Sequence, residues 1–587
     1  LPPSACANVG SSMAKFLFGL ITGVVLSVAG LLLLFFALAR TFRESPPVVA
    51  QNSVLQLQLS GDIPERPPVE VPFGAFAERP AATVAGVWMT LRKAAVDARI
   101  KAVVLEPESL SVGWGKLEEF RADLERFKKS GKPLFAFLKT PGAREYYLAS
   151  AADRIYLGPT DWLNLKGMRV ELMYFKKTLD KIGVDVQVEH DGKYKDFGDM
   201  FTRTSMSPET QEVMTGIVDD LYGNLVGRIA QARQKTPNAV RALIDQGPFL
   251  ANDALRDGLV DQLRYEDQMF ADLQQKVNSG ELHKLSTGNY QKVSPDSLGL
   301  EGRHRIAMLV GDGTITRGAA GDDGVSDDGI QATGFNRLLR RIAGDASVDG
   351  VVVRIDSPGG DAVASDEIWR EMNLLSKKKP VVISMSDTAA SGGYYMAMTG
   401  DPVVAYPGTL TGSIGVVFGK PNLHGLYDKL GITKDMIARG RFAAIDSDYS
   451  DLSAAEMAKL KEGIDANYHD FVAKVAESRR RPFERIEPLA QGRVWLGDQA
   501  KANGLVDELG GLDRALELVK QKARIPASEN VAIVMYPARR SIFDVLFGRA
   551  QESAVESRLR RLVKDWPPEL WANGGLLRMM PYTVNAQ

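Results

Sequence analysis

Short apolar runs alternate with amphipathic stretches along most of the chain. Residues 351–355 and 380–385 are rich in β-branched side chains and predict buried strands. Apolar residues recur at helical spacing over 117–127 and 367–375, which predicts amphipathic helices. Strands that alternate with helices in this way are typical of an α/β fold with a largely parallel sheet.

A different pattern occupies the start of the chain, where residues 16–39 contain no charged side chain. About 24 residues rising 1.5 Å each cover roughly 36 Å, enough to span a hydrocarbon core of ~30 Å. We therefore predict one transmembrane helix within an anchor over 13–43, after an upstream remnant over 1–12 and before a proline-containing linker over 44–50. Removal as a signal peptide stays an alternative, because Ala37-Leu38-Ala39 resembles a cleavage site. The flanking charges do not fix the orientation.

The remainder of the chain contains one pattern twice. Residues 97–105 match 345–353, and Tyr146-Tyr147 matches Tyr394-Tyr395, both at an offset of 248 residues. Further matches follow in the same order. A repeat of this length indicates two copies of a domain, not a solenoid.

We assign the first copy to residues 51–300 and the second copy to residues 301–540. The tail over 541–587 mixes apolar residues with arginines. Such a segment is expected to lie on a neighbouring subunit or on a membrane surface.

The second copy carries a Ser-Gly-Gly sequence that the first copy lacks. Ser391, Gly392 and Gly393 follow the predicted strand over 380–385, where we expect the chain to turn sharply into a helix. Free N–H groups and the helix dipole favour negative charge at such a position, which suits a nucleophile whose reaction builds an oxyanion. A capping serine is the ordinary alternative, but the first copy has Ala143 at the matching position.

A second glycine pair distinguishes the copies in the same way. Gly359 and Gly360 follow the predicted strand over 351–355, whereas the first copy has Ser111 and Val112 there. Paired glycines allow backbone N–H groups to approach a ligand closely. The loop is therefore a candidate part of the same site.

The complementary difference appears at a lysine. Lys195 of the first copy aligns with Ala443 of the second, while Lys193 keeps a basic counterpart in Arg441. An isolated lysine is ordinarily a solvated surface group. Reciprocal loss of serine in one copy and of lysine in the other indicates one Ser–Lys site shared between the copies. Whether the two residues meet within one chain or between chains stays open, and His424 remains an alternative base.

Composition adds few constraints. The chain is 45% hydrophobic and 25% charged, as in ordinary globular proteins, and its net charge of -1 gives no argument for nucleic-acid binding. Cys6 is the only cysteine, and the five histidines are scattered. We expect no metal, no organic cofactor and no nucleic-acid partner.

Over roughly residues 51–540 the sequence resembles the long, duplicated form of the signal peptide peptidase A family, also called protease IV. Four motifs carry this resemblance: Ser357-Pro358-Gly359-Gly360, Ala390-Ser391-Gly392-Gly393-Tyr394, Thr411-Gly412-Ser413-Ile414-Gly415 and Tyr194-Lys195. It implies two tandem ClpP/crotonase-like domains. It also implies site roles, which are Ser391 as nucleophile, Lys195 as general base, Ser413 as the hydroxyl that orients the lysine, Gly360 and Gly392 as oxyanion-hole donors, and Gly359 and Gly393 as supporting turn residues.

The resemblance further implies a membrane-anchored serine endopeptidase that digests residual signal peptides. Its location would be the bacterial inner membrane, with the catalytic domains on the periplasmic side. A ring- or dome-shaped homo-oligomer is implied, with a tetramer favoured.

A lysine acts as a base when burial disfavours its ammonium form. Neutral Lys195 would take the proton of Ser391 as the hydroxyl attacks a peptide carbonyl, giving an acyl-enzyme. One departure from the family pattern is Asp196, where we expect a small residue. If this segment is a strand, the Asp196 side chain points away from the lysine.

Two other functions fit the same fold. The first is a crotonase-like enzyme acting on acyl-CoA, although nothing in the sequence marks a CoA site. The second is an inactive membrane scaffold, which the presence of both Ser391 and Lys195 disfavours.

Overall fold

The computed structural model describes residues 48–67, 82–318, 329–537 and 577–580, with a few isolated positions between 19 and 30. The described residues from Val49 onward belong to one compact unit, to which the following description applies. Among the described residues, no helix is both long and apolar enough to cross a bilayer. Most of the expected anchor over 16–39 lies outside them, so the anchor stays a prediction.

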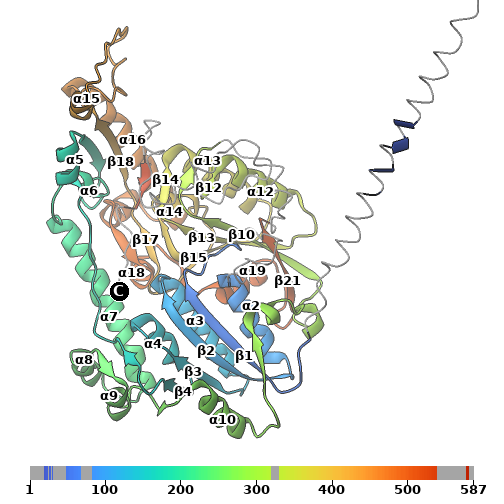
Figure 1. The fold of residues 1–587 in the computed structure, drawn as a ribbon. Helices are drawn as coiled ribbons and strands as arrows, with labels where there is room; N and C mark the ends of the chain where they lie inside the picture. Colours follow the sequence, from blue (N-terminus) through green and yellow to red (C-terminus); the bar gives the residue numbers. More distant parts are fainter. Residues whose placement is uncertain are drawn as a thin grey trace, which may run out of the picture. The chain divides into compact units, whose positions relative to one another are not determined.

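A six-stranded parallel sheet forms the centre of the first copy (Figure 1). Its strands lie in the order β8-β4-β3-β2-β1-β9. All residues of β3 are buried, as expected for a parallel strand covered on both faces. The bounds are β1 Ser53–Gly61, β2 Ile100–Leu110, β3 Leu134–Leu138, β4 Arg154–Leu157, β8 Gln262–Leu263 and β9 His283–Ser286.

The second copy is built on a sheet of the same kind. Its strands lie in the order β19-β17-β15-β13-β10-β21, and β16 and β20 extend it beside β15. Only the β17–β19 pair is antiparallel among the described strands of this sheet. The bounds are β10 His304–Asp312, β13 Gly350–Ser357, β15 Val381–Ala390, β16 Val403–Ala405, β17 Leu410–Gly412, β19 Val494–Leu496, β20 Glu508–Leu509 and β21 Val531–Tyr536. The strand expected over 351–355 is confirmed within β13, and the strand expected over 380–385 is confirmed by β15, which begins one residue later, at Val381.

A third sheet joins strands of both copies. Its order is β12-β11-β14-β22-β18-β6, in which β6 belongs to the first copy and β22 to the C-terminal tail. Strand β6 pairs antiparallel with β18, from Val416 opposite Asp191 to Asn422 opposite Asp185. The bounds are β6 Asp185–Asp191, β11 Ile315–Thr316, β12 Ile330–Gln331, β14 Gly359–Asp361, β18 Val416–Asn422 and β22 Leu577–Met579, and a separate pair is formed by β5 Trp162–Leu163 and β7 Phe249–Leu250.

Helices connect the strands and cover the sheets. The predicted helices over 117–127 and 367–375 are confirmed within α3 and α13. The long helix α7 begins at Pro208 after Ser207, whose hydroxyl accepts a hydrogen bond from the Thr210 N–H. The bounds are α2 Val84–Val96, α3 Trp114–Lys128, α4 Ala143–Ala149, α5 Lys176–Ile182, α6 Asp199–Thr202, α7 Pro208–Ala232, α8 Pro237–Ile244, α9 Ala251–Arg256, α10 Glu266–Val277, α11 Thr287–Gln291, α12 Ala332–Gly344, α13 Ala362–Ser376, α14 Gly392–Met396, α15 His424–Leu430, α16 Ala454–Arg479, α17 Phe483–Ile486, α18 Gly497–Asn503 and α19 Leu512–Lys522.

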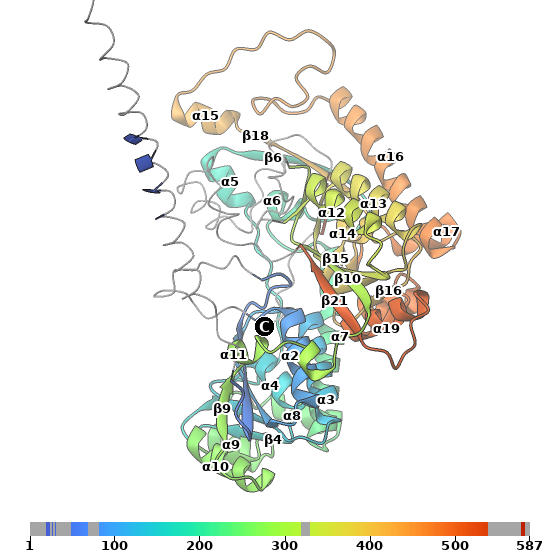
Figure 2. The same cartoon turned by 90° about the vertical axis from the view of Figure 1, so that its right-hand side faces the viewer.

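The two copies share their hydrophobic core. Trp88 of α2 packs in one apolar cluster with Met308 and Val352 of the second sheet. Ala390 and Leu496 of the second copy belong in turn to the main cluster of the first copy. Figure 2 shows the strands of the first copy, such as β4 and β9, below those of the second, such as β10 and β15.

Buried ion pairs also cross between the copies. Arg354 of β13 is fully buried and donates hydrogen bonds to Glu65 and Glu119 of the first copy. Lys116 of α3 lies 2.8 Å from Asp356 of the second copy. The copies are therefore fixed relative to one another at the strand ends that carry the candidate site.

Candidate active site

Ser391 sits on a sharp turn between β15 and α14. Its φ of 53° is positive, a conformation that non-glycine residues rarely adopt and that recurs at functional sites. The turn is held because the Ser391 N–H donates to the Gly412 carbonyl at 2.8 Å, and the Tyr395 N–H donates to the Ser391 carbonyl at 2.8 Å. The strand-to-helix turn expected from the sequence is therefore present, with Ser391 at the N-cap of α14.

Lys195 reaches this serine from the other copy. Its Nζ lies 2.8 Å from Ser391 Oγ, and both residues are fully buried. Since both residues belong to the described chain, the pair forms within one chain. Lys193 by contrast is exposed, with its Nζ over the ring of Tyr194.

Ser413 completes the surroundings of the lysine amine. Lys195 Nζ lies 2.9 Å from Ser413 Oγ and 3.0 Å from the Ser413 carbonyl oxygen. Ser413 also has a positive φ, of 50°, and its N–H donates to the Arg493 carbonyl at 2.7 Å. The amine therefore lies between two hydroxyls, one of which is the candidate nucleophile.

Two glycines leave the space that the lysine stem fills. A Cβ on Gly415 would lie 3.1 Å from Lys195 Cδ, and a Cβ on Gly492 would lie 2.6 Å from Lys195 Cβ. Gln491 holds the same turn, because its carbonyl accepts from the Tyr194 N–H at 2.8 Å. Nothing in the sequence singles out Gln491 and Gly492, since the first copy also contains Gln246-Gly247.

The glycines beside the serine lie against neighbouring backbone and leave no room for a side chain. A Cβ on Gly360 would lie 2.1 Å from the Ile315 carbonyl oxygen, and a Cβ on Gly393 would lie 2.7 Å from the Ser357 carbonyl oxygen. Gly359 has a φ of 103°, and its N–H donates to Ser357 Oγ at 3.2 Å. Strand β14, which contains Gly359 and Gly360, contacts α14, where Gly392 is the first residue. The structure thus brings both expected oxyanion-hole glycines to the serine turn.

Asp196 is not in a strand, contrary to our premise for its orientation. Residues 192–198 lie between β6 and α6, outside any strand, so the alternation rule does not apply to Asp196. The carboxyl group is buried, accepts a hydrogen bond from the Thr210 hydroxyl, and keeps Oδ1 without a hydrogen-bond partner among the described residues. Burial raises the pKa of Asp196 to about 6, while the charge of Lys195 acts to lower it. The charge of Lys195 therefore acts on this carboxyl group, with a smaller effect than burial.

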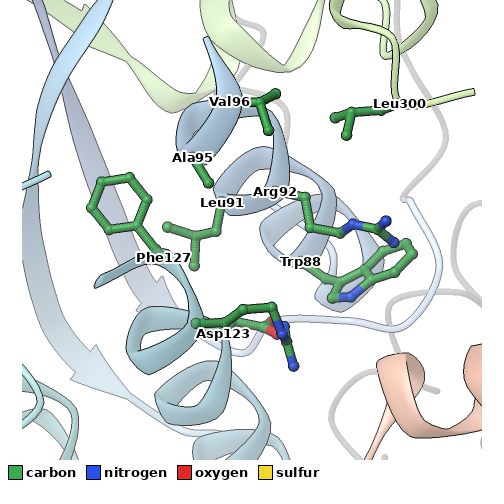
Figure 3. A pocket seen from close by; sticks show the side chains of 9 residues that line it. Trp88, Leu91, Arg92, Ala95, Val96, Asp123, Phe127 and Leu300 are labelled. Carbon is green, nitrogen blue, oxygen red and sulfur yellow. The ribbon is translucent and has the colours of Figure 1, made fainter. Parts of the chain in front are cut away.

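The remaining candidates lie elsewhere. His424 is half exposed on α15, and its ring lies tilted against the ring of Tyr449. A cavity of about 220 Å³ between α2 and α3 is lined by residues such as Trp88, Leu91 and Phe127 (Figure 3), and no predicted site residue lines it. The group around Ser391 is thus the candidate site.

Comparison with known proteins gives the family. Residues 126–279, which include Lys195, and residues 373–526, which include Ser391, each match the model described as Peptidase family S49. The tandem match confirms the duplication expected from the sequence.

Several curated proteins are similar over most of their length. The chain is 37% identical to Serine protease SPPA, chloroplastic, of Arabidopsis thaliana, covering 85% of this chain and 74% of that protein. It is 31% identical to Protease 4 of Haemophilus influenzae, covering 74% of this chain and 72% of that protein. It is also 31% identical to Protease 4 of Salmonella typhi, covering 77% of this chain and 74% of that protein.

Among solved structures, a ClpP1 mutant of Listeria monocytogenes covers 36% of this chain and 94% of its own, at 15% identity and a TM-score of 0.24. That overlap is too low to support an argument, so the ClpP/crotonase-like assignment stays a prediction. The relatives named as proteases favour peptide hydrolysis over the acyl-CoA and scaffold alternatives. The chain belongs to Peptidase family S49, and it is a serine peptidase.

Proposed function

We propose that the chain hydrolyses peptides with a Ser–Lys dyad assembled from its two copies. The observation that carries this proposal is the 2.8 Å separation of Lys195 Nζ and Ser391 Oγ inside a fully buried site. Lys195 takes the serine proton, Ser391 attacks the carbonyl carbon, and the N–H groups of Gly360 and Gly392 stabilise the oxyanion. The protonated lysine then gives this proton to the leaving amine as the peptide C–N bond breaks, which returns the lysine to its neutral form. Ser413 holds the amine toward the serine. Water then hydrolyses the acyl-enzyme, with Lys195 as the base.

The pH dependence of peptide hydrolysis tests the lysine base. Because only the neutral amine accepts a proton, we expect kcat/KM to rise with pH as Lys195 loses its proton. A profile that stays flat from about pH 6 to about pH 10, with chemistry rate-limiting, contradicts the proposal.

Asp196→Asn sharpens this experiment. The negative charge of Asp196 favours the ammonium form of Lys195, so removing this charge should move the rising limb of the pH profile to lower pH. Asp199→Asn is the matched control, because Asp199 already faces the cation Arg203 at 3.4 Å. An unchanged limb in Asp196→Asn, or a shift to higher pH, refutes the electrostatic role.

We also propose that the chain assembles into a ring- or dome-shaped homo-oligomer, with a tetramer favoured. Support comes from the internal repeat around α5 and α15, which match at the offset of 248 residues. In the first copy, β6 follows helix α5 and pairs with β18. The segment before α5, residues 168–174, is not in a strand. In the second copy the order is reversed: the paired strand β18 precedes helix α15, and the exposed segment after α15, residues 433–439, is not in a strand.

The two unpaired segments can repeat the β6–β18 pairing between neighbouring chains. The register of β6 and β18, carried over by the repeat, sets Glu171 opposite Met436. Each chain offers one segment of each kind, so the contacts run head to tail and can close a ring. At such a junction, Ala143 would take the place that Ser391 has within the chain, and Ala443 would take the place of Lys195. The contact between chains would therefore contain no second dyad.

Cysteine cross-linking tests this register. In a Cys6→Ser background, Glu171→Cys with Met436→Cys should form covalent oligomers on mild oxidation. Glu171→Cys with Ile437→Cys is the control, because adjacent strand residues point to opposite faces. Equal cross-linking by both pairs contradicts the proposed interface, and so does a lack of cross-linking by either pair.

We propose, finally, that the uncharged segment over 16–39 anchors the chain in the bacterial inner membrane, with the catalytic unit on the periplasmic side and cleaved signal peptides as substrates. The full chain should then stay with membranes in alkaline carbonate, and protease added outside the inner membrane should digest residues 49–587. Release into the soluble fraction contradicts the anchor.

A further inference from the structure

Arg493 directly precedes β19 in the second copy, and its side chain contacts the first copy. The guanidinium carbon, Cζ, lies 4.8 Å from the centre of the Tyr194 ring and 4.7 Å from the centre of the Trp495 ring. The guanidinium also donates a hydrogen bond to the carboxylate of Glu212 on α7. A cation that lies over two aromatic rings and beside a carboxylate is held more firmly than a surface arginine with one partner.

Tyr194 takes part in the same contact from the side of the first copy. Its hydroxyl lies 3.1 Å and 3.2 Å from the two carboxylate oxygens of Glu212, and its N–H donates to the Gln491 carbonyl at 2.8 Å. Tyr194 directly precedes Lys195 in the sequence. The turn that carries the lysine is therefore held through the backbone, the ring and the hydroxyl of Tyr194.

The backbone of Arg493 holds the second support of the lysine amine. Its carbonyl accepts a hydrogen bond from the Ser413 N–H at 2.7 Å. The hydroxyl of Ser413 in turn lies 2.9 Å from Lys195 Nζ. One residue therefore contacts both the turn that carries the amine and the serine that holds it.

The repeat provides a control, because the mirrored positions cannot form this contact. The Gln-Gly pair at 491–492 matches the pair at 246–247, and the capping serines Ser207 and Ser453 set the register of α7 against α16. The mirrored positions hold residues without a charge or a hydroxyl group: Pro248 for Arg493, Ala458 for Glu212 and Phe442 for Tyr194. The contact is thus lost in the same mirrored set of positions that replaces the dyad by Ala143 and Ala443.

We infer that Arg493 is a positioning residue, which sets the place of Lys195 Nζ against Ser391 Oγ, with Glu212 of the first copy as its counter-ion. It acts through the turn that carries Lys195 and through Ser413. This inference rests on the proposed function, since its effect requires that Lys195 is the base. A displacement of a catalytic group by about 1 Å can lower the rate about a hundredfold.

Steady-state kinetics on a peptide substrate tests this role in the full chain. Arg493→Met removes the charge and keeps most of the length of the side chain. We expect kcat to fall about 10- to 100-fold, because the base is displaced. KM should stay within about twofold, because the lost interaction serves the chemical step. Arg493→Lys keeps a cation near the Tyr194 ring and should restore kcat to within about fivefold of the wild-type value.

Glu212→Gln tests the counter-ion independently. Its side chain is 53% exposed, so the substitution leaves the core unchanged. It should lower kcat in the same direction as Arg493→Met, with KM again unchanged. Since both variants break one contact, the double variant should be no slower than Arg493→Met alone.

Arg514→Met is the matched control. Arg514 also lies in the second copy, is 34% exposed and pairs with the carboxylates of Glu508 and Glu517. Its replacement should leave kcat within about twofold, as expected for an exposed ion pair. Circular dichroism verifies that each variant is folded at the assay temperature.

Three results would overturn the positioning role. They are an equal kcat in Arg493→Met and Arg514→Met, a raised KM with unchanged kcat, and additive losses in the double variant with Glu212→Gln. Lys195→Ala separates this failure from failure of the dyad. If Lys195→Ala loses activity while Arg493→Met keeps its kcat, only the role of Arg493 is wrong. If Lys195→Ala stays active, the dyad is wrong and the inference falls with it.

Discussion

Replacing either member of the dyad should reduce peptide hydrolysis by about three orders of magnitude or more in kcat/KM. Ser391→Ala removes the attacking oxygen, and Lys195→Ala removes the group that lies 2.8 Å from it. Since each residue acts only with the other, the double variant should be no slower than either single variant. Steady-state kinetics on one peptide substrate, with circular dichroism to verify folding, measures the effect.

Lys193→Ala is the matched control. Lys193 is exposed two residues from Lys195, and the second copy keeps a basic residue, Arg441, without a catalytic partner. Its replacement should leave kcat/KM within about twofold, as expected for a surface position. If the Lys193 and Lys195 variants lose activity equally, the assignment of the base is wrong.

The largest effect on stability is expected from Arg354. Its side chain is fully buried between Glu65 and Glu119, which are each 1% exposed. Arg354→Met leaves two buried carboxylates without their cation, which typically costs about 3–5 kcal/mol in the free energy of unfolding. Because the pairs connect the two copies, activity and folded structure should be lost together on denaturation.

Arg340→Met provides the comparison. Arg340 also pairs with a carboxylate, Glu371 at 2.7 Å, but its side chain is 67% exposed. An exposed pair contributes about 0–1 kcal/mol, so the unfolding midpoint in urea should change little. A loss in Arg354→Met no larger than that in Arg340→Met contradicts the proposed role of the buried pairs.

Much of the site could be predicted because the duplication supplies an internal comparison. Ser391 opposite Ala143, and Lys195 opposite Ala443, pointed to complementary halves of one site. The turn at Ser391 was also visible, since an apolar run followed by Ser-Gly-Gly is a local signal. The structure brings the two residues together within one chain, a point that sequence offsets alone leave open.

Other features of the structure could not be predicted, because they depend on contacts between residues that are far apart in the sequence. The pairing of β22 with β14 joins residues more than 200 positions apart, and nothing near Leu577 marks it as a strand. The turn that presents Lys195 is shaped by Gln491 and Gly492 from the other copy. The orientation expected for Asp196 rested on strand alternation, but Asp196 is not in a strand. Its carboxyl group instead accepts a hydrogen bond from Thr210 of α7.

Covalent labelling tests the central claim most directly. A fluorophosphonate probe reacts with serines that are activated by a neighbouring base, and mass spectrometry identifies the modified residue. The dyad predicts that the wild-type chain is modified at Ser391 and that labelling is lost in Lys195→Ala but kept in Lys193→Ala. Modification at another serine, or labelling of Ser391 at an equal rate in Lys195→Ala, would contradict a dyad shared between the two copies.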